Sequence, residues 1–143
     1  AEADPSVRVI VVRGAGHRAF SAGADISEFA ASRTGAAAAR YNDLLQGVPG
    51  LVLPPLTEGH VFHQYTVRIP VGRDQVAEEL ASKGIGTMVY YPVPLHRLPV
   101  YGYPEGTFPE AERASREVLS LPMGPLLGPQ NEHVASLLRE ILA

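Results

Sequence analysis

The chain has 143 residues, of which 45% are hydrophobic and 19% charged, a balance typical of one folded domain. Its net charge of −3 gives no broad positive field for a nucleic-acid backbone, and without cysteine it has neither disulfides nor thiolate metal ligands. No apolar run has the length of a membrane helix. We therefore expect one compact cytoplasmic domain over residues 1–143, with no nucleic-acid or membrane partner.

The N-terminal quarter predicts a strand, a loop and a helix. Residues 7–13 form a β-branched run that ends in glycines, which is typical of a buried strand that enters a loop. Residues 25–31 predict a short helix, because Asp25 can cap it and Glu28, three residues later, can complete a capping box.

The middle of the chain predicts a helix and a strand on either side of a connector. Alanine-rich residues 35–46 predict a helix, and Gly47 predicts its end. Residues 47–59 contain prolines and glycines and predict an extended connector. Residues 60–69 alternate in polarity, which predicts a strand.

The second half predicts an α/β arrangement with few strands. Helical spacing and breakers predict a helix over 74–83, a strand over 85–91, a proline-rich loop over 92–106, a helix from a capping box at Thr107 to about residue 119, and a last helix over 129–142. The predicted fold class is therefore α/β (α+β), a small few-stranded sheet packed with helices.

Two strings near the N-terminus are similar to a known superfamily. Residues 8–16 (RVIVVRGAG) and 19–29 (AFSAGADISEF) resemble enoyl-CoA hydratases/isomerases, the crotonase superfamily. The resemblance covers about residues 4–40 and implies that the Ala24 amide donates to a thioester oxyanion, as in an oxyanion hole, with the backbone of Ala22 near coenzyme A. It also implies that the second donor and the catalytic glutamates come from later segments of that family, so enoyl-CoA hydratase activity is not expected.

The remainder resembles a different family. The strings ARYNDLL (39–45), HVFHQYTVR (60–68), KGIGT (83–87), YPVPLH (91–96) and LSLPM (119–123) resemble the C-terminal small domain of DegT/DnrJ/EryC1/StrS sugar aminotransferases, which use pyridoxal phosphate. The sequence thus reads as a chimera, with a crotonase-like segment over 1–37 and an aminotransferase-like segment over 38–143. The resemblance places the single lysine, Lys83, at a helix end and not at the cofactor, so aminotransferase activity and pyridoxal phosphate are not expected.

Histidines are the best metal ligands in a chain without cysteine. His60, His63 and His96 form the candidate metal site, since the aminotransferase resemblance implies that the strands near them are neighbours. A spacing of three within a strand places two side chains on opposite faces, so either His60 lies in a loop or ligands come from a second chain. The alternative is that His63 and His96 are inherited polar contacts.

Two carboxylates are the candidate catalytic groups. Asp25 and Glu28 could act as a general base or as further metal ligands. The alternative is that they only cap the helix over 25–31.

These observations favour a metal-dependent hydrolase. A divalent ion, expected to be zinc, would generate a hydroxide that attacks small activated esters or phosphoesters, for example phosphotriesters. Two alternatives remain open: a catalytically silent fusion of two fragments that oligomerises, and a module that retains binding of coenzyme A or a nucleotide sugar. Apolar surface left without a partner predicts a homo-oligomer, expected to be a dimer.

Overall fold

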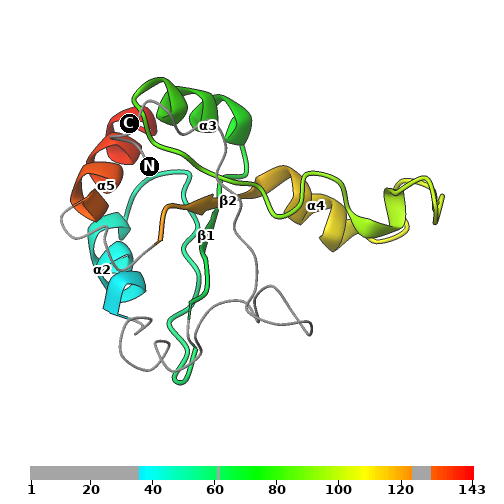
Figure 1. The fold of residues 1–143 in the computed structure, drawn as a ribbon, viewed down its shortest axis with the longest axis horizontal. Helices are drawn as coiled ribbons and strands as arrows, with labels where there is room; N and C mark the ends of the chain where they lie inside the picture. Colours follow the sequence, from blue (N-terminus) through cyan, green and yellow to red (C-terminus); the bar gives the residue numbers. More distant parts are fainter. Residues whose placement is uncertain (1–35, 61, 124–129) are drawn as a thin grey trace, which may run out of the picture.

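The protein is described by a computed structural model over residues 36–60, 62–123 and 130–143 (Figure 1). The predicted strand over 7–13 and helix over 25–31 lie outside these ranges. The described elements, in chain order, are helix α2 (Ala36–Leu45), strand β1 (Tyr65–Arg68), helix α3 (Arg73–Ser82), the 3-10 helix η2 (Leu95–Arg97), helix α4 (Pro109–Glu117), strand β2 (Val118–Leu121) and helix α5 (Gln130–Ile141).

The sheet is small and antiparallel, as predicted for a few-stranded α/β fold. Strands β1 and β2 pair with Tyr65 opposite Leu121 and Arg68 opposite Val118. Two isolated bridges, Val52 with Arg68 and Met88 with Ser120, widen it by one segment on each side. The predicted strand over 60–69 is therefore shorter than expected, and the predicted strand over 85–91 supplies only the bridge at Met88.

The two faces of the sheet differ in polarity because β1 alternates. Tyr65 and Val67 are fully buried on the face that packs against the helices. On the opposite face, the hydroxyl groups of Thr66 and Ser120 share a hydrogen bond of 2.8 Å across the strand pair. The helices therefore cover one face, and Figure 1 shows α2, α3 and α5 around it.

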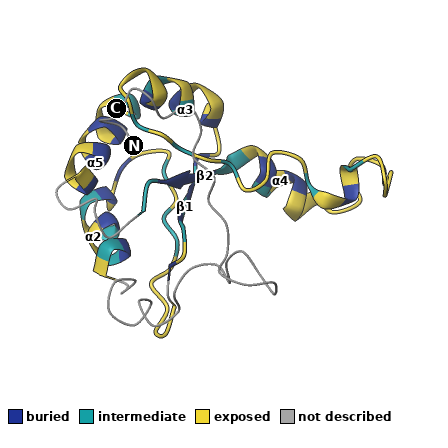
Figure 2. Cartoon of the chain, viewed as in Figure 1, coloured by how far each residue is buried: buried dark blue, intermediate teal, exposed yellow. Residues whose placement is uncertain are grey.

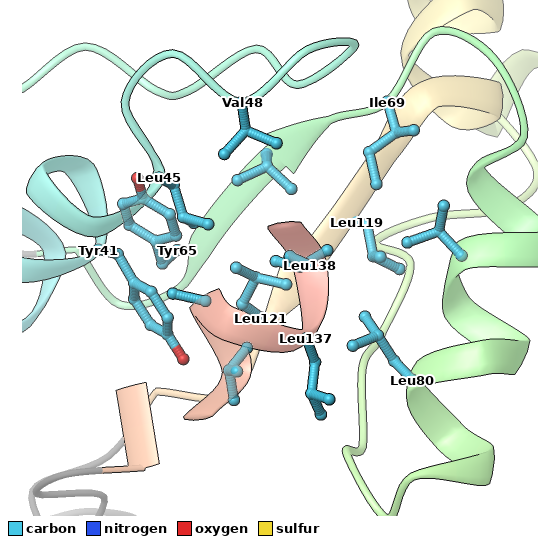
Figure 3. Packing of buried hydrophobic residues seen from close by; sticks show 14 of the residues in the cluster. Tyr41, Leu45, Val48, Tyr65, Ile69, Leu80, Leu119, Leu121, Leu137 and Leu138 are labelled. Atoms are coloured by element: carbon cyan, nitrogen blue, oxygen red, sulfur yellow. The ribbon is translucent and has the colours of Figure 1, made fainter. Parts of the chain in front are cut away.

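The hydrophobic core lies between these helices and the sheet (Figures 2 and 3). The rings of Tyr41 and Tyr65 stack there with centroids 4.9 Å apart, and Leu80, Leu119 and Leu138 are fully buried in the same core. Each fully buried leucine stabilises the fold by about 1.5–3 kcal/mol relative to an exposed one. Within the described ranges, no helix is both long and apolar enough to cross a membrane.

Helix α4 and the loop before it form an arm that extends away from the core (Figure 1). The predicted capping box is wrong, because the Thr107 hydroxyl donates to the Pro104 carbonyl at 2.7 Å and the N-cap residue is Phe108. Pro109 begins the helix, where its fixed φ is favourable and an N–H is not needed.

Helix α4 is followed directly by β2, without an intervening loop. Both carbonyls at the junction are bound: the Ile69 amide donates to Glu117 at 2.8 Å, and Nη1 of the buried Arg73 donates to Val118 at 2.8 Å. The predicted helix to residue 119 is therefore too long, because Leu119 enters the core as part of a strand.

Candidate functional site

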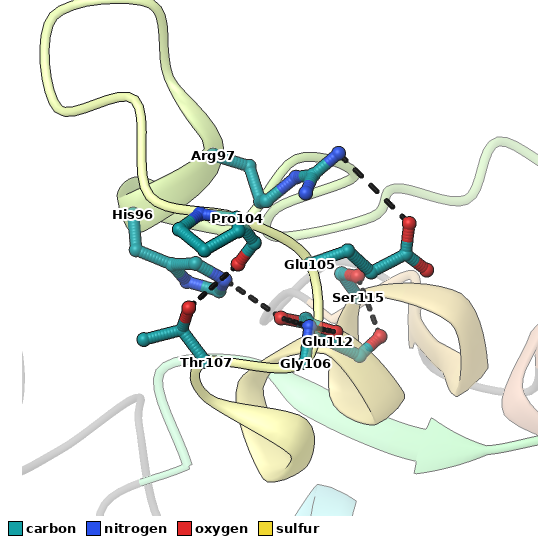
Figure 4. Close-up of polar contacts among 8 residues, drawn as sticks. All are labelled: His96, Arg97, Pro104, Glu105, Gly106, Thr107, Glu112 and Ser115. Carbon is teal, nitrogen blue, oxygen red and sulfur yellow. Dashed lines mark hydrogen bonds and ion pairs between the residues drawn. The ribbon is translucent and has the colours of Figure 1, made fainter.

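A buried histidine–glutamate pair joins the loop of the arm to α4 (Figure 4). His96 lies on η2, and Nε2 of its ring is 2.9 Å from Oε1 of Glu112 on α4. Both side chains are 8% exposed. The Gly106 amide donates to both carboxylate oxygens of Glu112, at 2.8 and 2.9 Å. Gly106 has a φ of +85°, a conformation that glycine adopts without strain.

These contacts determine the protonation state of Glu112. The hydrogen bonds from the Gly106 amide are the main cause that holds the pKa of this carboxyl below its ordinary value, with smaller contributions from His96 and the Phe108 amide, although burial opposes the shift. An ionised carboxylate only accepts hydrogen bonds, so the proton between the two side chains lies on Nε2. Glu112 therefore fixes the orientation of the His96 ring.

Neighbouring groups hold the pair in place. The Phe108 ring packs edge-on against His96, with centroids 5.0 Å apart, and the Ser115 hydroxyl donates to the Glu112 carbonyl at 2.8 Å. The Tyr103 amide donates to the His96 carbonyl at 3.1 Å, which closes the loop over η2. The arm is thus held by interactions of its own.

A groove of about 420 Å³ runs beside this pair. One side is formed by residues 90–96 and the other by Phe108 and the inner face of α4. Its lining is mainly aromatic and aliphatic and includes His96. The arrangement offers an apolar binding surface beside a histidine of fixed orientation.

The predicted metal site is not assembled by these histidines. His60 is exposed before β1, where its Nδ1 accepts the Phe62 amide at 2.9 Å and its ring packs on that of Phe62, and His63 is exposed two residues before β1. His96 is instead buried against Glu112. Among the residues that the structure describes, no group of three or more histidine, aspartate or glutamate side chains could hold a metal ion.

Asp25 and Glu28, the predicted catalytic carboxylates, lie outside the described residues, as do the crotonase-like backbone positions Ala22 and Ala24. Their predicted roles stay predictions.

Sequence reasoning missed Glu112 as the partner of His96. On a helix, Glu112 is expected to pair with Arg116, four residues later. Glu112 and Ser115, three residues apart, both lie on the buried face of α4, but a serine does not mark a buried face in sequence. A carboxylate on such a face needs a partner from another element, and here η2 supplies it.

Solved structures define the class of this protein. The chain superposes on Streptomyces venezuelae DesV in complex with a ketimine intermediate, with a TM-score of 0.72 and 42% identity over 77% of this chain and 31% of that one. It also superposes on DesI in the presence of its TDP-sugar product, with a TM-score of 0.72 and 30% identity over 82% of this chain and 33% of that one. The fold is therefore that of about a third of each of these two solved chains.

Residues 24–139 match the DegT/DnrJ/EryC1/StrS aminotransferase family, and the chain belongs to this family. It is 44% identical to the dTDP-3-amino-3,4,6-trideoxy-alpha-D-glucose transaminase of Streptomyces venezuelae, over 76% of this chain and 30% of that protein. It is 49% identical to a pleiotropic regulatory protein of Geobacillus stearothermophilus, over 72% of this chain and 30% of that protein. The chain thus spans about a third of the length of these relatives.

Family membership corrects the functional predictions. The expected metal-dependent hydrolase, with zinc and phosphoesterase activity, is wrong, because the matched family is an aminotransferase family and the Streptomyces venezuelae relative is a transaminase. The expectation that the protein is neither an aminotransferase nor linked to pyridoxal phosphate is wrong for the same reason. The number of histidines was misleading, because it indicated metal chemistry but does not show that their side chains lie close together in the fold.

The described residues do not themselves form an attachment point for pyridoxal phosphate. Lys83, the single lysine of the sequence, is the C-cap residue of α3, and its Nζ lies 3.1 Å from Oε1 of Glu140 on α5. It is absent from the lining of the groove beside His96.

Proposed function

We propose that this chain is the small-domain portion of a pyridoxal-phosphate-dependent sugar aminotransferase that acts on a nucleotide-linked keto sugar. The observation that carries the proposal is the match of residues 24–139 to the aminotransferase family, supported by the fold shared with DesV at 42% identity. The substrate class follows from the Streptomyces venezuelae relative, whose name specifies a dTDP-linked amino sugar. A small molecule is therefore the expected substrate of the complete enzyme.

The contribution of this chain to that enzyme is a folded unit of fixed shape. The core closes β1, β2 and three helices into one body, and the His96–Glu112 pair holds the arm. The reacting groups that bind the cofactor would come from the part of the enzyme that the relatives have in addition.

A graft tests the proposal. Residues 36–143 replace the matching part of the Streptomyces venezuelae transaminase, and the rate of amino transfer to that enzyme's own keto-sugar substrate is measured. The graft should retain activity within about tenfold of the parent, because the identity of 44% preserves the core that positions the unit.

A matched variant controls for assembly. The same graft with Leu138→Asp places a charge in the core, where Leu138 is fully buried, and should lose both folding and activity. A graft that folds and retains pyridoxal phosphate but transfers no amino group would overturn the proposed function.

We propose further that the chain forms a homodimer, that residues 1–143 are one domain, and that residues 1–37 have a different origin from the remainder. The crotonase resemblance over 4–40 supports the last point, whereas the aminotransferase match already begins at residue 24 and opposes a boundary at residue 37. Sedimentation of the purified chain tests the dimer, and a monomer at all concentrations contradicts it. The cytoplasmic location stays a prediction.

A further inference from the structure

The loop at the end of the arm buries almost none of its side chains. We call residues 95–107 the strap, since they include η2 and the chain that leads to α4. His96 is the only buried residue of the strap, and Figure 2 shows most of the remainder exposed. Even Tyr101 and Tyr103 are 60% and 52% exposed. Burial of apolar surface therefore contributes little to keeping the strap closed.

The polar contacts of the strap are local as well. Among the described residues, its hydrogen bonds and ion pairs join it only to itself, to Pro94 before it and to Glu112 on α4. The Tyr103 amide, for example, donates to the His96 carbonyl at 3.1 Å within the strap. Opening of the strap therefore leaves the described hydrogen bonds of the sheet intact.

One carboxylate joins both ends of the strap to α4 (Figure 4). Oε1 of Glu112 is 2.9 Å from Nε2 of His96, near the start of the strap, and both carboxylate oxygens accept the amide of Gly106, near its end. Hydrogen bonds to an ionised carboxylate are roughly twice as strong as those between neutral groups. The stabilisation of the closed strap is therefore concentrated at Glu112.

Helix α4 is anchored to the core independently of the strap. It passes directly into β2, and the Ile69 amide donates to the carbonyl of Glu117, the last residue of the helix, at 2.8 Å. Nη1 of the buried Arg73 donates to the next carbonyl, that of Val118, at 2.8 Å. The strap can therefore move while α4 stays in place.

We propose that the strap opens and closes as one unit while the core stays folded, with Glu112 as the latch that keeps it closed. The open strap exposes the His96 ring and the Glu112 carboxylate, which are each 8% exposed when it is closed. It also withdraws Leu95 and His96 from the groove that they line. The inference rests on the contacts of the strap and not on the proposed aminotransferase function.

Amide hydrogen exchange of the 143-residue chain tests whether the strap opens separately. The amides of Tyr103 and Gly106 report on the strap, and those of Arg68 and Ser120, which bond across the sheet, report on the core. Rates are measured by nuclear magnetic resonance at urea concentrations below the unfolding midpoint and corrected for intrinsic exchange. The strap amides should exchange at least about tenfold faster than the core amides, with a weaker dependence on urea, because strap opening exposes little surface.

Two results of this experiment would overturn the proposal. Equal rates with equal urea dependence would show that the strap opens only when the whole protein unfolds. Exchange of the strap amides at their intrinsic rates would show that nothing keeps the strap closed.

A pair of glutamine substitutions tests the latch. Glu112→Gln keeps the shape of the side chain, but removes its charge and replaces one acceptor oxygen by a donor. The amides of Tyr103 and Gly106 should then exchange at least about tenfold faster. Glu110→Gln is the matched control, because Glu110 lies on the same helix but pairs with Arg113 at the surface, and it should leave these rates unchanged.

The two variants can also contradict the proposal. Strap amides that exchange no faster in Glu112→Gln, or equally fast in both variants, would show that Glu112 is not the latch. Circular dichroism of Glu112→Gln should still show one cooperative unfolding transition. Its loss would show that Glu112 holds the core and not the strap alone.

Discussion

Glu112 shows how a single side chain can hold a long loop without a regular hydrogen-bonding pattern. Its carboxylate binds Gly106 before α4 and His96 on η2, so three points of the arm meet at one group. A histidine in a proline-rich loop can be recognised in sequence, but its partner cannot, since Glu112 lies 16 positions away and has Arg116 as a nearer candidate.

The lowered pKa of Glu112 predicts a stability that depends on pH. A carboxyl with a folded pKa below its unfolded value stabilises the fold above the unfolded pKa and loses this contribution as pH falls through the folded pKa. In Glu112→Gln this contribution is absent, so the difference in melting temperature between wild type and variant should shrink as pH falls from 7 to below about 4.

Glu110→Gln is the matched control, because Glu110 lies on the same helix but pairs with Arg113 at the surface. Its melting temperature should follow the wild type at every pH. If Glu112→Gln also follows the wild type, the carboxylate does not hold the arm.

The buried tyrosines predict a second effect, at alkaline pH. Burial raises the pKa of Tyr41 to about 12, and its hydroxyl donates to the Pro122 carbonyl at 3.0 Å. A raised folded pKa gives a contribution that is complete below the unfolded pKa, near 10, and is lost as pH rises through the folded value. Ultraviolet titration of Tyr41→Phe should lack one late-ionising phenol; an unchanged titration curve is the contradicting result.

At the scale of the elements, predictions from periodicity worked where one pattern was sustained. The helices predicted over 35–46, 74–83 and 129–142 lie within one or two residues of α2, α3 and α5. Strand β2 was missed because its four residues follow α4 without a break and are too few to show a period of their own. Only pairing with the distant β1 distinguishes the two possibilities.

The helices contribute to stability through the core side chains that they bury. Leu80 on α3 is fully buried, so Leu80→Ala should lower the free energy of unfolding by about 2–5 kcal/mol, measured by urea denaturation. Leu56→Ala removes the same atoms from a half-exposed position in the connector and should change it by less than about 1 kcal/mol. Equal losses would mean that α3 does not pack as described.

For the whole molecule, the sequence was sufficient for the fold class and for the resemblance to an aminotransferase small domain, but not for the function. Five histidines indicated a metal site, although convergence of side chains depends on tertiary placement that spacing does not encode. The Glu112–His96 pair illustrates the same limit, since it required η2 and α4 to meet.

The core predicts that residues 36–143 fold without the N-terminal segment. The buried hydrophobic residues of the described core lie between Ala38 and Leu138. A chain of residues 36–143 should therefore unfold in one cooperative transition, with a melting temperature within about 5 °C of the full chain, measured by circular dichroism. Loss of cooperativity would show that the core needs the first 35 residues.

Because α4 passes directly into β2, the position of the arm is coupled to the position of a strand in the core. The carbonyl oxygens on both sides of that junction accept hydrogen bonds, one from the Ile69 amide and one from the Arg73 guanidinium. A rotation of the arm would displace Leu119 and Leu121 from their pairing register with β1. Binding of a molecule that displaces the arm should therefore alter the sheet, and a change in the hydrogen-exchange rates of the β2 amides would report it.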